Sequence, residues 1–144
     1  MNNPEHLSGD TDRRPPRHSA DMHPAIARLD EADATADVRA RWELGIARHG
    51  NPFVAFLTFE DIDPTAPDLL TTFGLVYYAT FPDLRECADT FIGALGWQSS
   101  LDQVERSQPD IAGLLTWDYA LIEERIRDVY EVVEYGGQIH LFDR

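Results

Sequence analysis

The chain has 144 residues, which is enough for one ordinary domain with a core of its own. It carries 26 acidic and 12 basic residues, a net charge of −14, and every basic residue is arginine. Such a charge repels DNA, RNA and anionic lipid, so it argues against nucleic acid or a membrane surface as partner and favours basic proteins or cations. A role in solubility alone is the plainer alternative.

Cysteine content and hydropathy indicate the compartment. The single Cys87 excludes an internal disulfide, and its place on an apolar helical stripe predicts a small core residue rather than a reactive thiol. No apolar run approaches the ~20 residues of a membrane span, and the N-terminus lacks the apolar stretch of a signal peptide. We therefore expect a cytoplasmic protein without a membrane partner.

The first 50 residues are expected to form two parts. Residues 1–22 are polar and cannot bury enough apolar surface to fold, so we expect a disordered tail. Residues 23–50 show a helical pattern, in which Ile26 and Leu29 make a short first stripe and Thr35 is placed to cap a second helix. The predicted inward residues of the second helix are Val38, Trp42, Leu44 and Ile46.

Residues 51–144 are expected to form an acidic α+β domain. Its first segment, Phe53–Phe59, fits either a buried strand or a helix, and the preceding Asn51-Pro52 favours the helix. A short helix at 67–73 and a strand at about 75–79 follow.

The clearest element is an amphipathic helix over residues 80–97, with Thr80 as its expected cap and Gly96 at its end. Its apolar residues recur at helical spacing and are Leu84, Cys87, Ala88, Phe91, Ile92 and Leu95. The acids off this stripe are Asp83, Glu86 and Asp89. One face is therefore apolar and another is anionic.

Three further helical segments are predicted before the last strands. The first is a turn at Ser100, and the second begins at Pro109 with Leu114 and Leu115 inward. The third is capped by Thr116. Its inward stripe is Tyr119, Ile122 and Ile126, and its solvent side carries Asp118, Glu123, Glu124 and Asp128.

The chain ends in a predicted hairpin, with strands at 129–135 and 138–142 joined by Gly136-Gly137. That loop pairs Val133 with His140, and places His140 on the outer face as a surface or partner-pairing residue. The face expected to pack on the helices holds Tyr130, Val132, Ile139 and Leu141. The predicted fold is thus α+β and mainly helical, with helices packed on a small antiparallel sheet.

Residue sets typical of catalysis are missing. There is no phosphate-binding glycine loop, nucleophile elbow or zinc-binding spacing, so we expect neither an enzyme nor a cofactor nor a metal. The turn Asp61–Pro64 has the acid spacing of a calcium loop, yet Ala66 and Thr72 stand where glycine and glutamate are required. An enzyme with an unfamiliar site stays open as an alternative.

Three stretches resemble one protein family. The first, Phe73–Asp89, is similar to a Tyr-ending strand followed by an acidic helix. The second, Thr116–Ile126, is similar to an Asp-Tyr helix, and the third, Tyr135–Phe142, is similar to a closing Gly-Gly hairpin. In this order, over residues about 50–142, they resemble the C-terminal two-thirds of ArdA-type antirestriction proteins. Residues 1–48 show nothing like the N-terminal module of that family, which suggests a shortened or repurposed member.

The resemblance implies an acidic DNA mimic that inhibits a type I restriction–modification enzyme by occupying its DNA-binding groove. The acids expected to form this surface are Asp61, Asp63, Asp68, Asp83, Glu86, Asp89, Asp118, Glu123, Glu124 and Asp128. Relatives dimerise, so a homodimer through Val133, Tyr135 and the hairpin edge is also expected. The alternative is a non-enzymatic acidic adaptor that binds another basic host or defence protein.

Overall fold

The computed structural model describes residues 34–144, so the predicted tail at 1–22 and the helical piece at Ile26 and Leu29 lie outside the described residues. The helices are α2 (Ala36–His49), α3 (Asn51–Phe56), α4 (Leu69–Val76), α5 (Leu84–Ala94), α6 (Trp97–Ser107) and α7 (Tyr119–Val129), with a short 3-10 helix η1 (Pro109–Ile111). The strands are β1 (Tyr77–Phe81), β2 (Glu131–Tyr135) and β3 (Gln138–Phe142). The predicted fold class is confirmed. Within this part of the chain, no helix is long and apolar enough to cross a bilayer.

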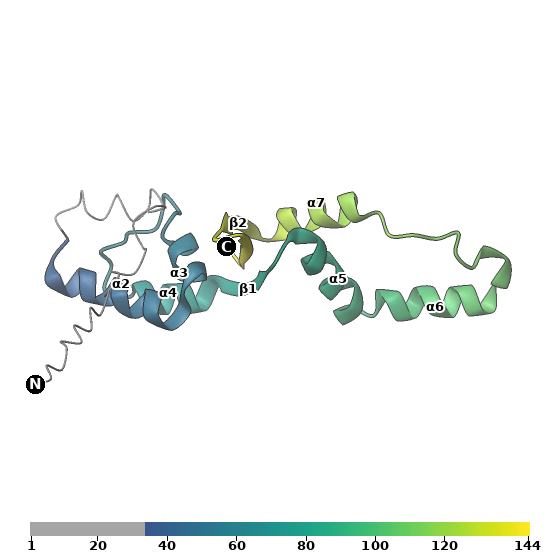
Figure 1. The fold of residues 1–144 in the computed structure, drawn as a ribbon, viewed down its shortest axis with the longest axis horizontal. Helices are drawn as coiled ribbons and strands as arrows, with labels where there is room; N and C mark the ends of the chain where they lie inside the picture. Colours follow the sequence, from purple (N-terminus) through teal and green to yellow (C-terminus); the bar gives the residue numbers. More distant parts are fainter. Residues whose placement is uncertain (1–33) are drawn as a thin grey trace, which may run out of the picture.

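The strands form one antiparallel sheet in the order β1-β3-β2. The predicted hairpin register is confirmed, because Val133 pairs with His140 and Val132 with Leu141. Gly136 and Gly137 both have positive φ, at 63° and 74°, as a two-residue primed turn requires. Figure 1 shows the sheet in the middle of a drawn-out body, with α2–α4 on one side and α5–α7 on the other.

The central strand β3 is buried on both faces. Ile139 and Leu141 pack with Cys87, Ala88 and Ile126 beneath α5 and α7, and we call this set the aliphatic cluster. On the opposite face lies the aromatic cluster, whose buried members are Val38, Trp42, Phe53, Ala55, Phe56, Leu57, Phe59, Leu69, Phe73 and Phe142. The prediction that His140 lies at the surface is wrong. Its side chain is 0% exposed, because α2–α4 cover the face that the sequence pattern assigned to solvent.

Edge-to-face and stacked rings build the aromatic cluster. Phe142 meets Phe59 edge-on at 5.1 Å between centroids, and Phe73 stacks on Tyr77 at 5.1 Å. The segment after α3 is tied to α2 by the indole nitrogen of Trp42, which donates to the Pro64 carbonyl at 2.7 Å. Helix α2 therefore shares a core with the residues that follow it.

Several predicted boundaries and burials shift. Phe53–Phe56 is helical as favoured, but α4 continues through Gly74 to Val76, so the strand predicted at 75–79 runs over Tyr77–Phe81. Thr80 lies in that strand and is not a helix cap. The cap of α5 is Asp83, whose carboxylate accepts from the Glu86 amide at 2.8 Å. At the other end of the sheet, β2 begins at Glu131 rather than at residue 129.

Helix α6, η1 and the segment to residue 118 form an arm at the far end of the molecule (Figure 1). No residue of α6 or η1 is buried, and Leu114 and Leu115, predicted to point inward, are 73% and 45% exposed. The arm is closed by Trp117, whose ring lies 6.2 Å from that of Trp97 and whose indole donates to Gln98 at 3.1 Å. Leu44 and Ile46 of α2 are likewise exposed rather than inward.

Candidate functional site

The ten predicted acids fall into two groups. The α5–α7 acids lie on these two helices or at their caps and are Asp83, Glu86, Asp89, Asp118, Glu123, Glu124 and Asp128. The loop acids, between α3 and the start of α4, are Asp61, Asp63 and Asp68. Nine of the ten are exposed and Glu123 is half-buried. The structure thus places the predicted surface mainly on one pair of neighbouring helices.

A three-residue contact ties α5 to α7. The Tyr119 hydroxyl donates to Asp89 at 2.6 Å, and the Arg85 guanidinium lies over the Tyr119 ring, 3.0 Å from its centroid. The hydrogen bond to the carboxylate raises the pKa of Tyr119, since it favours the protonated phenol. The contact fixes the position of one acidic helix against the other.

Two of the α5–α7 acids act as helix caps. Asp83 begins α5, and Asp118 begins α7 by accepting from the Leu121 amide at 3.1 Å. A carboxylate satisfies amides that have no partner at a helix start and complements the helix dipole. Thr116, the predicted cap of α7, lies two residues too early.

The loop acids are largely committed to local structure. Asp61 forms an ion pair with Arg144, and the hydrogen bond from that guanidinium lowers the pKa of the carboxyl. Asp63 accepts from the Thr65 hydroxyl at 2.7 Å and from its amide at 2.9 Å, and both bonds lower the pKa of Asp63. These contacts hold the turn that packs on α2.

Four α5–α7 carboxylates are left for an external partner, and the side chain of the loop acid Asp68 also forms no hydrogen bond or ion pair within residues 34–144. Within residues 34–144, the side chains of Glu86, Glu123, Glu124 and Asp128 form neither a hydrogen bond nor an ion pair. Glu124 and Asp128 are four residues apart on α7, so about 6 Å of axial rise separates them. We regard these four as the centre of the candidate surface.

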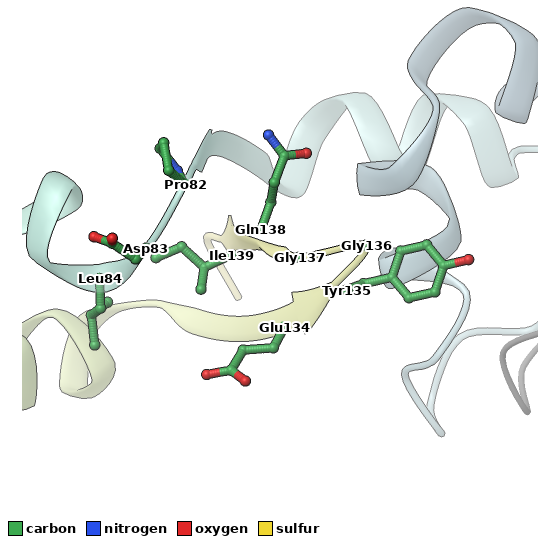
Figure 2. A pocket seen from close by; sticks show the side chains of 9 residues that line it. All are labelled: Pro82, Asp83, Leu84, Glu134, Tyr135, Gly136, Gly137, Gln138 and Ile139. Carbon is green, nitrogen blue, oxygen red and sulfur yellow. The ribbon is translucent and has the colours of Figure 1, made fainter. Parts of the chain in front are cut away.

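A hollow of about 520 Å³ lies where β1 leaves the sheet, and it is unlike a catalytic pocket. Figure 2 shows its walls, which come from Pro82–Leu84 on one side and the hairpin Glu134–Ile139 on the other. Its two carboxylates point away from one another, and that of Asp83 is occupied by the α5 cap. The hollow therefore brings no set of acid–base groups together.

An apolar groove of about 420 Å³ between α5 and α7 was missed by the sequence reasoning. It is lined by Phe91, Leu95, Trp97, Leu121, Ile122, Arg125, Ile126, Val129 and Tyr130. Leu95 and Val129 are more than half exposed, at 57% and 62%. The sequence contains a signal for this groove, because Leu121, Arg125 and Val129 recur every four residues. They form a second stripe on α7 next to its predicted inward stripe.

Metal and thiol chemistry find no support in this part of the chain. Residues 34–144 contain no group of three or more His, Cys, Asp or Glu side chains placed to hold a metal ion. Burial raises the pKa of the Cys87 thiol to about 11, as suits the small core residue that the sequence predicted.

No family model matches the chain, and no curated protein or solved structure matches it either. The function of the acidic surface must therefore be argued from its own chemistry.

Proposed function

We propose that this protein is a DNA mimic that inhibits a type I restriction–modification enzyme, or a similar basic DNA-handling complex, by occupying its DNA-binding groove. The observation that carries the proposal is the set of four carboxylates on the tied helices α5 and α7 that have no partner within residues 34–144. Inhibition by occupancy requires no chemistry from the protein, so we propose a cytoplasmic, non-enzymatic role without cofactor.

The spacing of the charges supports this proposal. Phosphates follow one another about every 3.4 Å along each strand of B-DNA. Carboxylates three or four residues apart on a helix are separated by about 4.5–6 Å of axial rise, which is of the same order. Residues 34–144 hold 19 acids against 8 arginines, so the described body attracts basic grooves from a distance.

The resemblance to ArdA-type proteins gives the same proposal its target. The acidic helix, the Asp-Tyr helix and the closing hairpin of that likeness correspond to α5, α7 and β2–β3. The part of the family pattern seen in this chain therefore coincides with the tied helices and the sheet that supports them.

Competition for DNA tests the proposal. A purified type I enzyme is bound to a labelled duplex carrying its site, and the protein is added at 50 mM and at 300 mM salt. We expect displacement of the duplex at low salt and a clear loss of displacement at high salt, because exposed charges are screened. A complex that stays intact at low salt with excess protein would refute the proposal.

We also propose that the protein forms a homodimer, but through the α5–α7 groove rather than the hairpin edge. Val133 and Tyr135 are half-buried against the aromatic cluster, whereas Leu121 and Val129 of the groove are exposed on both sides of Arg125. Two copies related by a two-fold axis would set each Leu121 against Val129 of the other. Salt should strengthen this apolar contact between two highly acidic chains, the reverse of its effect on the target. Sedimentation of the Val129→Glu variant at both salt concentrations tests the assignment, and a dimer that persists in that variant contradicts it.

The alternative is an acidic adaptor that binds another basic protein of the host or its defences. The groove favours it, because an exposed apolar strip is typical of a protein interface. Pull-down from a host lysate separates the two proposals, since the first requires a DNA-binding complex among the retained proteins.

A further inference from the structure

Within residues 34–144, His140 is the one buried ionisable side chain that links all three strands of the sheet. It stands in the central strand β3 and is 0% exposed. Its Nδ1 lies 2.8 Å from the Thr80 hydroxyl of β1, and its Nε2 lies 3.0 Å from the Tyr135 carbonyl at the end of β2. Thr80 is in turn 2.8 Å from the hydroxyl of Tyr77.

Three hydrogen bonds connect Tyr77, Thr80, His140 and the Tyr135 carbonyl, and one fact decides which atom donates in each of them. A carbonyl oxygen only accepts, so the hydrogen of a neutral His140 ring must be on Nε2. Nδ1 is then an acceptor, the Thr80 hydroxyl donates to it, and the Tyr77 hydroxyl donates to Thr80. The neutral ring satisfies all these groups.

A second proton on the ring reverses this order. Nδ1 becomes a donor, so the Thr80 oxygen must accept from it and the Thr80 hydrogen must turn towards Tyr77. The elements packed around the ring carry titratable groups, except α3 and α4, which contain none. They are Tyr77 and Tyr78 of β1, Glu131, Glu134 and Tyr135 of β2, and Asp37, Arg39, Arg41, Glu43, Arg48 and His49 of α2. In the part of the chain that the structure describes, no carboxylate bonds to the ring, and Glu131 is exposed opposite Phe142.

The protonated ring can keep its contacts with Tyr135 and Thr80, so the cost of protonation is a positive charge on a ring that is 0% exposed. The Tyr135 carbonyl that it holds is next to Gly136, and a methyl group added at Gly136 would overlap the Asn51 amide at the start of α3. The ring thus fastens the end of the sheet where it meets the α2–α4 layer.

We propose that His140 is an acid-sensitive link between the strands of the sheet. In its neutral form it joins β1, β2 and β3 beside α3, and its protonation opens this end of the sheet before the whole protein unfolds. The opening would separate the α2–α4 layer from the layer that carries the α5–α7 acids. The inference rests on the complete burial of the ring and on its position between the three strands, and it holds whether or not the protein mimics DNA.

The direction of the pH effect is set by burial, which lowers the pKa of His140 below its ordinary value of 6.5. Between 6.5 and that lowered pKa, the open state binds a proton that the closed state does not. The contribution of His140 to the closed state is therefore complete above pH 6.5 and is lost as the pH falls through the lowered pKa.

Nuclear magnetic resonance of the full chain between pH 7.5 and 4.5 tests the proposal. We expect the Nε2–H tautomer at neutral pH, a ring titration with its midpoint below 6.5, and loss of amide protection in β1 and β3 while α5 and α7 stay protected. A midpoint at or above 6.5, the Nδ1–H tautomer, or simultaneous loss of protection in all elements would overturn it.

Two variants distinguish opening caused by protonation of His140 from acid unfolding of the protein as a whole. His140→Gln keeps a donor and an acceptor but does not titrate, so the step in β1 and β3 should disappear, and an unchanged step contradicts the proposal. If that variant does not fold, Thr80→Val removes the acceptor of the protonated ring and should lower the midpoint by about one pH unit. A midpoint that stays in place or rises in Thr80→Val would also overturn it.

Discussion

Neutralising three unpaired carboxylates is the most direct test of the acidic surface. The triple variant Glu86→Gln/Glu124→Gln/Asp128→Asn changes the net charge from −14 to −11 and removes no side-chain hydrogen bond within residues 34–144. Each acid should meet one basic group of the target in an exposed ion pair, which contributes about 0.2–1 kcal/mol. Loss of three such pairs weakens binding by about 3- to 150-fold.

A second triple variant has the same charge but leaves the surface intact. Asp37→Asn/Glu43→Gln/Glu60→Gln changes exposed acids on α2 and the turn after α3, outside the candidate set. Long-range electrostatic attraction to the target falls equally in both variants, because their net charge is the same. Ion pairs with the basic groups of the target are lost only in the first variant. The control should therefore bind within about threefold of the parent protein at physiological salt.

The assay is inhibition of DNA binding by the type I enzyme, titrated with each variant at several salt concentrations. The first variant should also show a shallower dependence of affinity on salt. Circular dichroism confirms that both variants are folded. Equal losses in the two variants would refute the reasoning, because they would show that the total charge matters and its position does not.

Three further predictions concern the fold. Phe142→Ala removes a fully buried ring of the aromatic cluster and should cost about 3–5 kcal/mol in urea unfolding, and a cost below 1 kcal/mol would contradict its central place. Gly136→Ala and Gly137→Ala should each destabilise the protein by about 1–2 kcal/mol, because both glycines have positive φ, and the crowding of Gly136 adds little since the exposed Asn51 side chain can turn away. Asp118→Ala removes the cap of α7 and should lower stability by about 1 kcal/mol, as measured by thermal unfolding, with Asp118→Asn close to the parent.

The hairpin was predictable because its information is local. Two adjacent glycines define the turn, and the turn fixes the register of Val133 against His140. The burial of His140 was not predictable in the same way, since alternation along a strand does not tell whether a second layer covers the other face. That layer is built by α2–α4, from residues far away in the sequence.

Helix and strand boundaries failed where distant pairing decided them. Thr80 and Phe81 satisfy the local rules for a helix start, yet both pair with β3 some 60 residues later. Pro82 follows and ends the strand because it cannot donate to the ladder. Leu114 has an apolar side chain at helical spacing but no partner, so it stays exposed on the arm.

The exposure of nine of the ten candidate acids could be read from the sequence, but their contacts could not. Helical spacing placed the α5–α7 acids off the apolar stripes of their helices, whereas the three loop acids belong to no helical pattern. Whether an acid is committed depends on a partner elsewhere in the fold, such as Tyr119 for Asp89 and Arg144 for Asp61. The groove escaped notice because Leu121 was assigned to no apolar stripe and Val129 was assigned to the first strand of the hairpin.

The central position of β3 has a consequence for synthesis. Both clusters contain side chains from Gln138–Phe142, so neither can close until these residues have left the ribosome. Until then the earlier segments remain unfolded, with strand and helix surfaces that have no partner. Pairing of β1 with β3 must in addition close a long loop. Ribosomes stalled with β3 already synthesised but still inside the exit tunnel should therefore carry a protease-sensitive nascent chain, and release of that chain should be followed by rapid acquisition of resistance.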